Sequence, residues 1–191
     1  MSLRRTIEVV TRLAKAGAIR DYAIAGAVAA LNYIQPTLTE DLDVLVSVAH
    51  FDQRPSGLIL LGPIDNALVE MGYTERTDLG YLIEGWPVQF LPVASALDEE
   101  AVERAVDVEI DQTSDPPLTA RCLRAEHVVA IAVRLGRLKD LARVQSFLEQ
   151  NAVDLVALDD VLERHHLMHE WLSFCAKAGI ANPLKRPSSS P

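Results

Sequence analysis

Cysteine and aromatic residues are scarce in this sequence of 191 residues. Its two cysteines, Cys122 and Cys175, lie far apart and form no Cys-x-x-Cys spacing. This usage argues against a disulfide scaffold or a thiolate zinc site, and it favours a reducing compartment. Aromatic residues make up only 5% of the chain, whereas 49% of it is hydrophobic. We therefore expect a core built from Ala, Val, Leu and Ile.

Basic charge is also in short supply, because the formal net charge is −9. Proteins that coat nucleic acid neutralise phosphates with clustered Lys and Arg. The charge therefore makes extended nucleic acid an unexpected partner. It leaves room for a local basic pocket that holds a single nucleotide.

Long apolar runs are missing as well. No run reaches the roughly 20 residues that a membrane-spanning helix needs. The opening MSLRRTIEVV turns polar at Thr11-Arg12, which is too soon for the apolar region of a signal peptide. We expect a cytoplasmic protein that does not insert into a membrane.

The order of expected elements is mixed at first and helical later. Apolar spacing predicts a helix near the start, and two strands are predicted on either side of Glu84-Gly85. Asp98 is the predicted N-cap of a further helix. From Thr119 onward the apolar positions follow a helical stripe. We expect an α/β core over residues 1–118, a helical part over 119–180 and a disordered Pro- and Ser-rich tail over 181–191.

Two carboxylates stand at the start of a predicted buried strand, in the stretch Asp41-Leu42-Asp43. Alternate residues of a strand face the same way, so both aspartates face one side while Leu42 faces the core. Oxygen ligands of this kind suit Mg²⁺, which is typically held by one or two carboxylates together with substrate phosphates. The plainer interpretation is a pair of solvated aspartates beside a loop. Upstream, Gly26 lies between a short strand and a helix, where backbone N–H groups can approach a phosphate.

This succession of glycine, helix, loop and Asp-x-Asp strand resembles the nucleotidyltransferase fold of the DNA polymerase β type. The helical stretch of residues 126–150 resembles a bacterial branch of that superfamily, which includes the toxins of abortive-infection toxin–antitoxin systems. The residues that carry this second similarity are Glu126, His127, Arg137, Lys139 and Asp140.

The resemblance implies a fold, an activity and a set of roles. The fold is α/β, a small mixed sheet flanked by helices, followed by a helical C-terminal part. The activity is transfer of a nucleoside monophosphate from a triphosphate to a hydroxyl acceptor, with Mg²⁺ or Mn²⁺ as the metal. Asp41 and Asp43 are the implied catalytic and metal-binding residues. The implied nucleotide-binding residues are Gly26, Ala27, Arg137 and Lys139.

Three positions depart from the family pattern. Ala27 stands where a second Gly or Ser is usual, and Ala132 replaces a frequent Lys, with Arg134 two residues on. The third carboxylate is expected in the strand 88–91, where this chain has Gln89. An amide cannot act as a base for an attacking hydroxyl. Glu84 is a less favoured substitute for the missing acid. The alternative is therefore a degenerate member of the fold that binds a nucleotide or a protein partner.

The run ERHHLMHE, residues 163–170, suggests a second kind of site. His165 and His169 are four residues apart, as are His166 and Glu170, so each pair would share one face of a helix. A third zinc ligand is missing from the pattern. We favour a solvated or partly buried helix over a metal-binding module.

Overall fold

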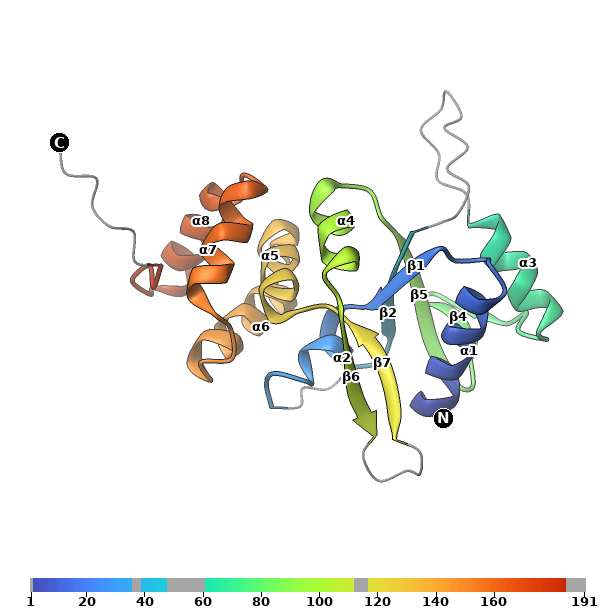
Figure 1. The fold of residues 1–191 in the computed structure, drawn as a ribbon. Helices are drawn as coiled ribbons and strands as arrows, with labels where there is room; N and C mark the ends of the chain where they lie inside the picture. The colour runs from blue at the N-terminus through green and yellow to red at the C-terminus, as the bar shows by residue number, and fades with distance from the viewer. Residues whose placement is uncertain (1, 36–38, 48–60, 112–116, 185–191) are drawn as a thin grey trace. The chain divides into compact units, whose positions relative to one another are not determined.

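The computed structural model describes residues 2–35, 39–47, 61–111 and 117–184 (Figure 1). The chain divides into two compact units. The α/β unit comprises the described residues up to 32 and from 39 to 124, and the helical unit comprises 33–35 and the residues from 125 onward. This arrangement confirms the predicted fold class, an α/β part with a mixed sheet followed by a helical part.

One mixed sheet organises the α/β unit. In the described residues its strands lie in the order β3-β4-β5-β2-β1-β7-β6. The central strand β2 is antiparallel to β1 and parallel to β5, and β1 is parallel to β7. The strand bounds are Asp21–Ile24 for β1, Leu42–Ser47 for β2, Arg76–Thr77 for β3, Gly80–Ile83 for β4, Trp86–Pro92 for β5, Val106–Asp111 for β6 and Leu118–Cys122 for β7.

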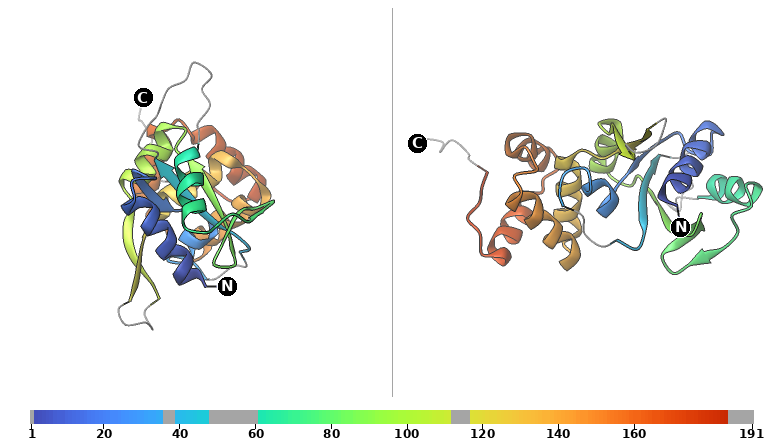
Figure 2. Two further views of the ribbon diagram at one scale, coloured as in Figure 1. Left: turned by 90° about the vertical axis from the view of Figure 1, so that its right-hand side faces the viewer. Right: turned by 90° about the horizontal axis from the view of Figure 1, so that it is seen from below.

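Helix α1 (Leu3–Lys15) packs its apolar stripe against the sheet (Figure 2). Ile7, Val10 and Leu13 are fully buried, which follows from their helical spacing. The hydroxyl of Thr6 donates to the carbonyl of Ile83 at 3.0 Å, which ties the helix to strand β4. The helix stops before Gly17, whose φ of +77° suits glycine.

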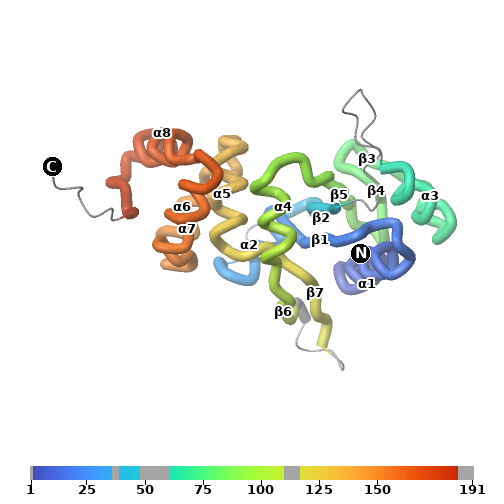
Figure 3. Tube along the Cα trace, turned by 45° about the horizontal axis from the view of Figure 1, so that its top comes forward, coloured from blue at the N-terminus to red at the C-terminus, as the bar shows by residue number. Residues whose placement is uncertain are grey.

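The remaining helices of this unit are short. They are α2 (Gly26–Ala30), α3 (Gly62–Glu70) and α4 (Ala96–Glu103), and Figure 3 follows α4 from β5 to β6. The predicted N-cap of α4 is wrong. The cap is Ser95, whose Oγ accepts from the backbone N–H of Asp98 at 3.2 Å, while Asp98 Oδ2 accepts from the Ser95 hydroxyl and from Ala94 N. The aspartate therefore completes a reciprocal cap one turn inside the helix.

The helical unit contains α5 (Ala125–Leu135), α6 (Leu138–Glu149), α7 (Leu155–Arg164) and α8 (Met168–Ala178) among its described residues. Gly136, with φ +64°, separates α5 from α6. The core of the unit includes Trp171 and Phe147, both fully buried. Tyr33 packs against Phe147 with ring centroids 6.0 Å apart.

The boundary between the two parts differs from the expected one. Residues 118–122 form strand β7, which pairs with β1 and β6, so the helical unit begins at Ala125 rather than at 119. The start of the expected tail is also ordered. Asn182 accepts from the indole N–H of Trp171 at 2.8 Å, and Leu184 is buried. Residues 185–191 lie outside the described part of the chain.

Within the described residues, every helix is too short or too polar to cross a bilayer.

Candidate active site around Asp41 and Asp43

Asp41 and Asp43 lie at the N-terminal end of β2, at the centre of the sheet. Asp41 directly precedes the strand and Asp43 is its second residue. Both aspartates are half-buried, whereas Leu42 and Val44 between and beyond them are fully buried. The alternation follows from strand geometry and places both carboxylates on one face of the sheet.

Gln89 lies next to this pair, on the parallel neighbour β5. The register sets Asp43 directly opposite Gln89. The side-chain amide of Gln89 donates from Nε2 to Oδ2 of Asp41 at 3.1 Å. The position at which the resemblance implies a third carboxylate therefore carries an amide that contacts the first one.

Gly26 closes the other side of the site. Its φ is +60°, and a Cβ at this position would lie 2.2 Å from Oδ2 of Asp43. The backbone N–H of Ala25 also donates to the carbonyl of Asp43 at 2.9 Å. Helix α2 starts here without a side-chain cap, with Ala27 in its first turn. The start of α2 lies directly against the Asp43 carboxylate, so there is no room for a side chain at position 26 and only glycine fits there.

Two further residues at the site were not predicted from the sequence. Gly80, with φ +120°, has no room for a Cβ, which would lie 2.2 Å from the carbonyl oxygen of Val88 and 3.3 Å from Cγ of Gln89. Thr39 donates from its hydroxyl to the carbonyl of Asp41 at 3.0 Å and to Oδ1 of Asp41 at 3.4 Å. The position of Gly80 in the turn Asp78-Leu79-Gly80 could have indicated its importance from the sequence. No sequence pattern distinguishes Thr39.

Two carboxylates converge here. Within the part of the chain that the structure describes, no group of three or more His, Cys, Asp or Glu is placed to hold a metal ion. The donor set of Asp41 and Asp43 fits a hard cation such as Mg²⁺ that takes its other ligands from phosphates and water.

Glu84, the candidate substitute for the missing acid, is engaged elsewhere. It lies in the turn between β4 and β5 with φ +51°, and it accepts from the hydroxyl of Tyr73 at 2.6 Å. Arg5 forms an ion pair with it at 3.8 Å. Burial, and then the neighbouring Glu84 carboxylate, raises the pKa of Tyr73. These contacts give Glu84 a structural role in the turn.

The two predicted basic residues belong to the helical unit. Arg137 and Lys139 flank the start of α6, and both are exposed. Arg137 pairs with the carboxylate of Asp140, which is 1% exposed and also contacts Arg143 at 3.3 Å. The Arg-x-Lys-Asp segment therefore pairs a buried carboxylate with a half-exposed arginine inside the helical unit.

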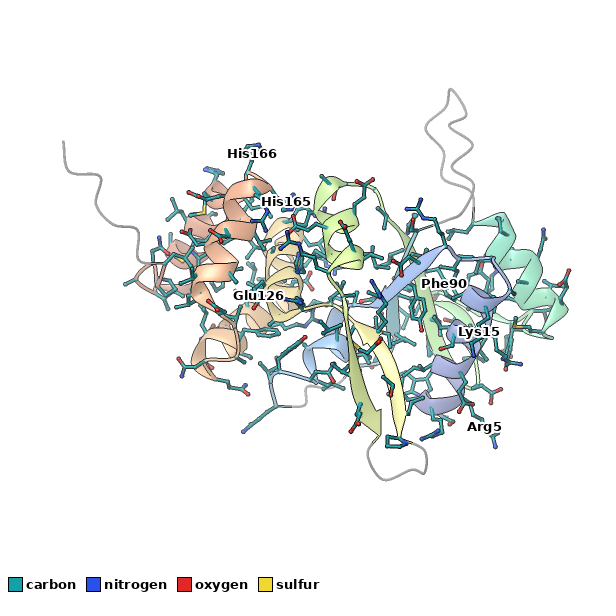
Figure 4. The ribbon with its side chains drawn as sticks, in the orientation of Figure 1. Arg5, Lys15, Phe90, Glu126, His165 and His166 are labelled. Carbon is teal, nitrogen blue, oxygen red and sulfur yellow. The ribbon has the colours of Figure 1, made fainter. Side chains whose placement is uncertain are left out.

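The predicted histidine helix is wrong. Helix α7 ends at Arg164, His165 caps it, and His166 adopts a φ of +56° before α8 begins at Met168. Figure 4 shows His165 and His166 in this turn. Since residues 163–170 do not form one continuous helix, the spacing of four residues does not bring His165 and His169 onto a common face.

No protein-family model matches the sequence, and no curated protein matches it. Solved structures do resemble it. One is the crystal structure of an antigenic nucleotidyltransferase-like protein from Paracoccidioides brasiliensis, with 14% identity, coverage of 93% of this chain and 88% of the other, and a TM-score of 0.55.

Two structures of the antibiotic-resistance factor ANT(2'')-Ia are also similar to this chain. A solution structure has 14% identity, covers 92% of this chain and 97% of its own, and has a TM-score of 0.47. A crystal structure with adenylyl-2''-tobramycin has 13% identity, coverage of 93% and 99%, and a TM-score of 0.45. We rely on the similarity to the Paracoccidioides brasiliensis protein, which at this identity concerns the fold alone. The fold of this chain is similar to that of nucleotidyltransferases.

Proposed function

We propose that this protein is a nucleotidyltransferase that binds a nucleoside triphosphate with Mg²⁺ or Mn²⁺ and transfers a nucleoside monophosphate to a hydroxyl acceptor. The observation that carries the proposal is the Asp41–Asp43 pair at the start of β2 with Gly26 seated against Asp43. A structural role for two half-buried carboxylates side by side is not evident, because like charges at this spacing repel. The similarity of the fold supports the same function.

Each residue has a stated role in the proposal. Asp41 and Asp43 would hold the cation, which when bound supplies positive charge against the triphosphate. The backbone N–H groups of Gly26 and Ala27, at the start of α2, would hold phosphate oxygens. The roles predicted for Arg137 and Lys139 in stabilising the leaving group stay predictions, as does the relation to the toxin branch. The acceptor is a molecule with a hydroxyl group, of a kind that these residues do not specify.

The test is calorimetric titration of ATP, GTP, CTP and UTP, each with Mg²⁺, into the wild type and into Asp41→Asn/Asp43→Asn. We expect Mg²⁺-dependent binding of at least one triphosphate to the wild type and none to the double variant. Asp78→Asn/Asp160→Asn is a control with the same charge change at two exposed positions. Bound triphosphate would then be offered, in labelled form, to a panel of hydroxyl acceptors.

A wild type that binds no triphosphate at millimolar concentration would contradict the proposal. The alternative would then stand, in which the fold serves as a binding module for a protein partner. Gln89 is the residue that motivates this alternative, because it removes the carboxylate that the resemblance implies. Triphosphate binding without transfer to any acceptor would instead indicate a nucleotide-binding protein that has lost catalysis.

A further inference from the structure

Both carboxylate oxygens of Asp41 already accept hydrogen bonds from neutral side chains. Gln89 donates from Nε2 to Oδ2 at 3.1 Å, and the Thr39 hydroxyl lies 3.4 Å from Oδ1. Each carboxylate oxygen has about two lone-pair sites, so a cation and a donor can share Oδ2. The amide hydrogens of Gln89 carry positive partial charge, so a cation on the same oxygen weakens or displaces this hydrogen bond. The hydrogen bond therefore competes with cation binding at Asp41.

Strand neighbours lie on both sides of Gln89. It stands opposite Asp43 in the parallel ladder between β5 and β2. On the other side is strand β4, where a Cβ on Gly80 would lie 3.3 Å from Cγ of Gln89. The backbone of Gln89 is therefore fixed within the sheet, and a rotation of its side chain is enough to break the bond to Asp41.

The amide also explains how the two aspartates coexist without a cation. A carboxylate at position 89 would place three negative charges on one small area of the sheet, because Gln89 is directly opposite Asp43 and bonded to Asp41. Like charges this close raise the free energy of the ionised state. Compared with a carboxylate at position 89, the amide of Gln89 removes one negative charge and donates a hydrogen bond to Asp41. Both effects stabilise the ionised aspartates.

From these contacts we propose that Gln89 is a latch on Asp41, which keeps the affinity for a free divalent cation low and makes cation binding depend on the phosphates of the nucleotide. The inference rests on the proposed function, in which Asp41 and Asp43 hold the cation. Two carboxylates, one of them latched, bind a free cation weakly. A triphosphate contributes further oxygen ligands and so compensates for the lost hydrogen bond. The cation and the triphosphate then bind as one unit.

The test uses Mn²⁺ alone as the probe and electron paramagnetic resonance of free Mn²⁺ as the readout, with the full chain. Gln89→Leu keeps the approximate volume and removes the donor, and Gln89→Asn shortens the side chain so that its amide falls short of Asp41. We expect each variant to bind Mn²⁺ about three- to tenfold more tightly than the wild type, as fits the loss of one competing hydrogen bond. Circular dichroism verifies that the variants fold.

A matched control lies in the helical unit, where the amide of Gln145 donates to Glu149 at 2.7 Å. Gln145→Leu removes the same kind of bond and should leave the Mn²⁺ affinity unchanged. A second series adds a non-hydrolysable triphosphate analogue. The analogue should tighten Mn²⁺ binding to both proteins, because its phosphates add oxygen ligands, and in the wild type this gain should offset the affinity lost to the latch.

The outcomes separate the latch from the proposed function. Equal or weaker Mn²⁺ binding by Gln89→Leu and Gln89→Asn would overturn the latch, and weaker binding would identify Gln89 as a ligand. If Asp41→Asn/Asp43→Asn binds Mn²⁺ with and without the analogue as the wild type does, the cation site itself is wrong, and the proposed function fails with it.

Discussion

Single residues set the shape of the candidate site, and the two aspartates are restrained in different ways. Asp43 is limited by the backbone, because Gly26 occupies the space beside its carboxylate. Asp41 is limited by side chains, because Gln89 and Thr39 donate to its two oxygens. Substitutions at Gly26 and Gln89 are therefore expected to act through different aspartates.

Gly26→Ala should distort the site while leaving most of the fold. The new Cβ would meet Oδ2 of Asp43 at 2.2 Å, so the carboxylate or the start of α2 must shift. Calorimetry should show a loss of triphosphate affinity of about tenfold or more, equivalent to about 1.4 kcal/mol. Gly17→Ala is the control, because Gly17 has a similar φ of +77° and open space around it. Both variants should lose about 1 kcal/mol of stability to backbone strain. An equal loss of affinity in the two variants would contradict the role of the contact.

Cys122 gives the stability a dependence on alkaline pH. The side chain is fully buried in β7, and burial raises the pKa of its thiol from 9.0 to about 12. The unfolded chain ionises first, so the contribution of the neutral thiol is complete below pH 9 and is lost as the pH rises toward 12. In urea unfolding, the advantage of the wild type over Cys122→Ala should shrink by about 2 kcal/mol between roughly pH 8 and pH 10.5. A constant difference across this range would show that the thiol ionises equally in both states.

Secondary-structure elements were predicted best where one local pattern decides them. The periodicity of apolar residues predicted α1, and the turn at Glu84-Gly85 predicted the hairpin of β4 and β5. The predictions were wrong where one local sequence pattern is compatible with two structures. Asp98 fits an N-cap as well as the third helical position, and the histidine run fits a helix as well as a turn with a positive φ at His166. For α4 the second structure is set by Ser95, whose hydroxyl caps the helix one turn before Asp98.

The start of α6 provides a prediction at this scale. Asp140 is buried and pairs with Arg137 and Arg143, whose side chains are 53% and 14% exposed. Asp140→Ala leaves Arg143 without its buried counter-charge and should destabilise the helical unit by about 3 kcal/mol. Arg137→Ala removes a largely solvated partner and should cost less than about 1 kcal/mol. Thermal unfolding of both variants measures the difference.

Arg137→Ala also tests the nucleotide-binding role predicted for that arginine. A variant that stays folded but loses triphosphate affinity would support the role. Unchanged affinity would leave Arg137 with its structural pairing to Asp140 alone.

At the scale of the whole molecule, the net charge of −9 constrains the partners. Single-stranded RNA of about 20 nucleotides, labelled for fluorescence anisotropy, should bind more weakly than about 100 µM at roughly 150 mM salt, because few phosphates can be neutralised. Tighter binding that falls steeply with salt would reveal a basic surface that the overall charge conceals. In that case an RNA hydroxyl would become a candidate acceptor.

The class of fold followed from the sequence, whereas the details of the site did not. The order of strands and helices predicted an α/β part with a helical part after it, and the mixed sheet was implied by the resemblance to the nucleotidyltransferase fold. The register that sets Gln89 opposite Asp43 comes from pairing between distant strands, and local patterns carry no information about it. The bond from Gln89 to Asp41 and the contact between Gly80 and Gln89 follow from that register.

The bond between Asp41 and Gln89 joins residues 48 positions apart, and this separation has a consequence for synthesis of the chain. A nascent chain that has emerged only as far as β2 can pair β1 with β2, but it lacks the strand that carries the amide. Asp41 then stands next to an open strand edge, without the amide of Gln89. Gln89 can contact Asp41 only after β5 has left the ribosome and paired in parallel with β2. The full set of contacts around the two aspartates therefore forms later than the antiparallel pairing of β1 with β2.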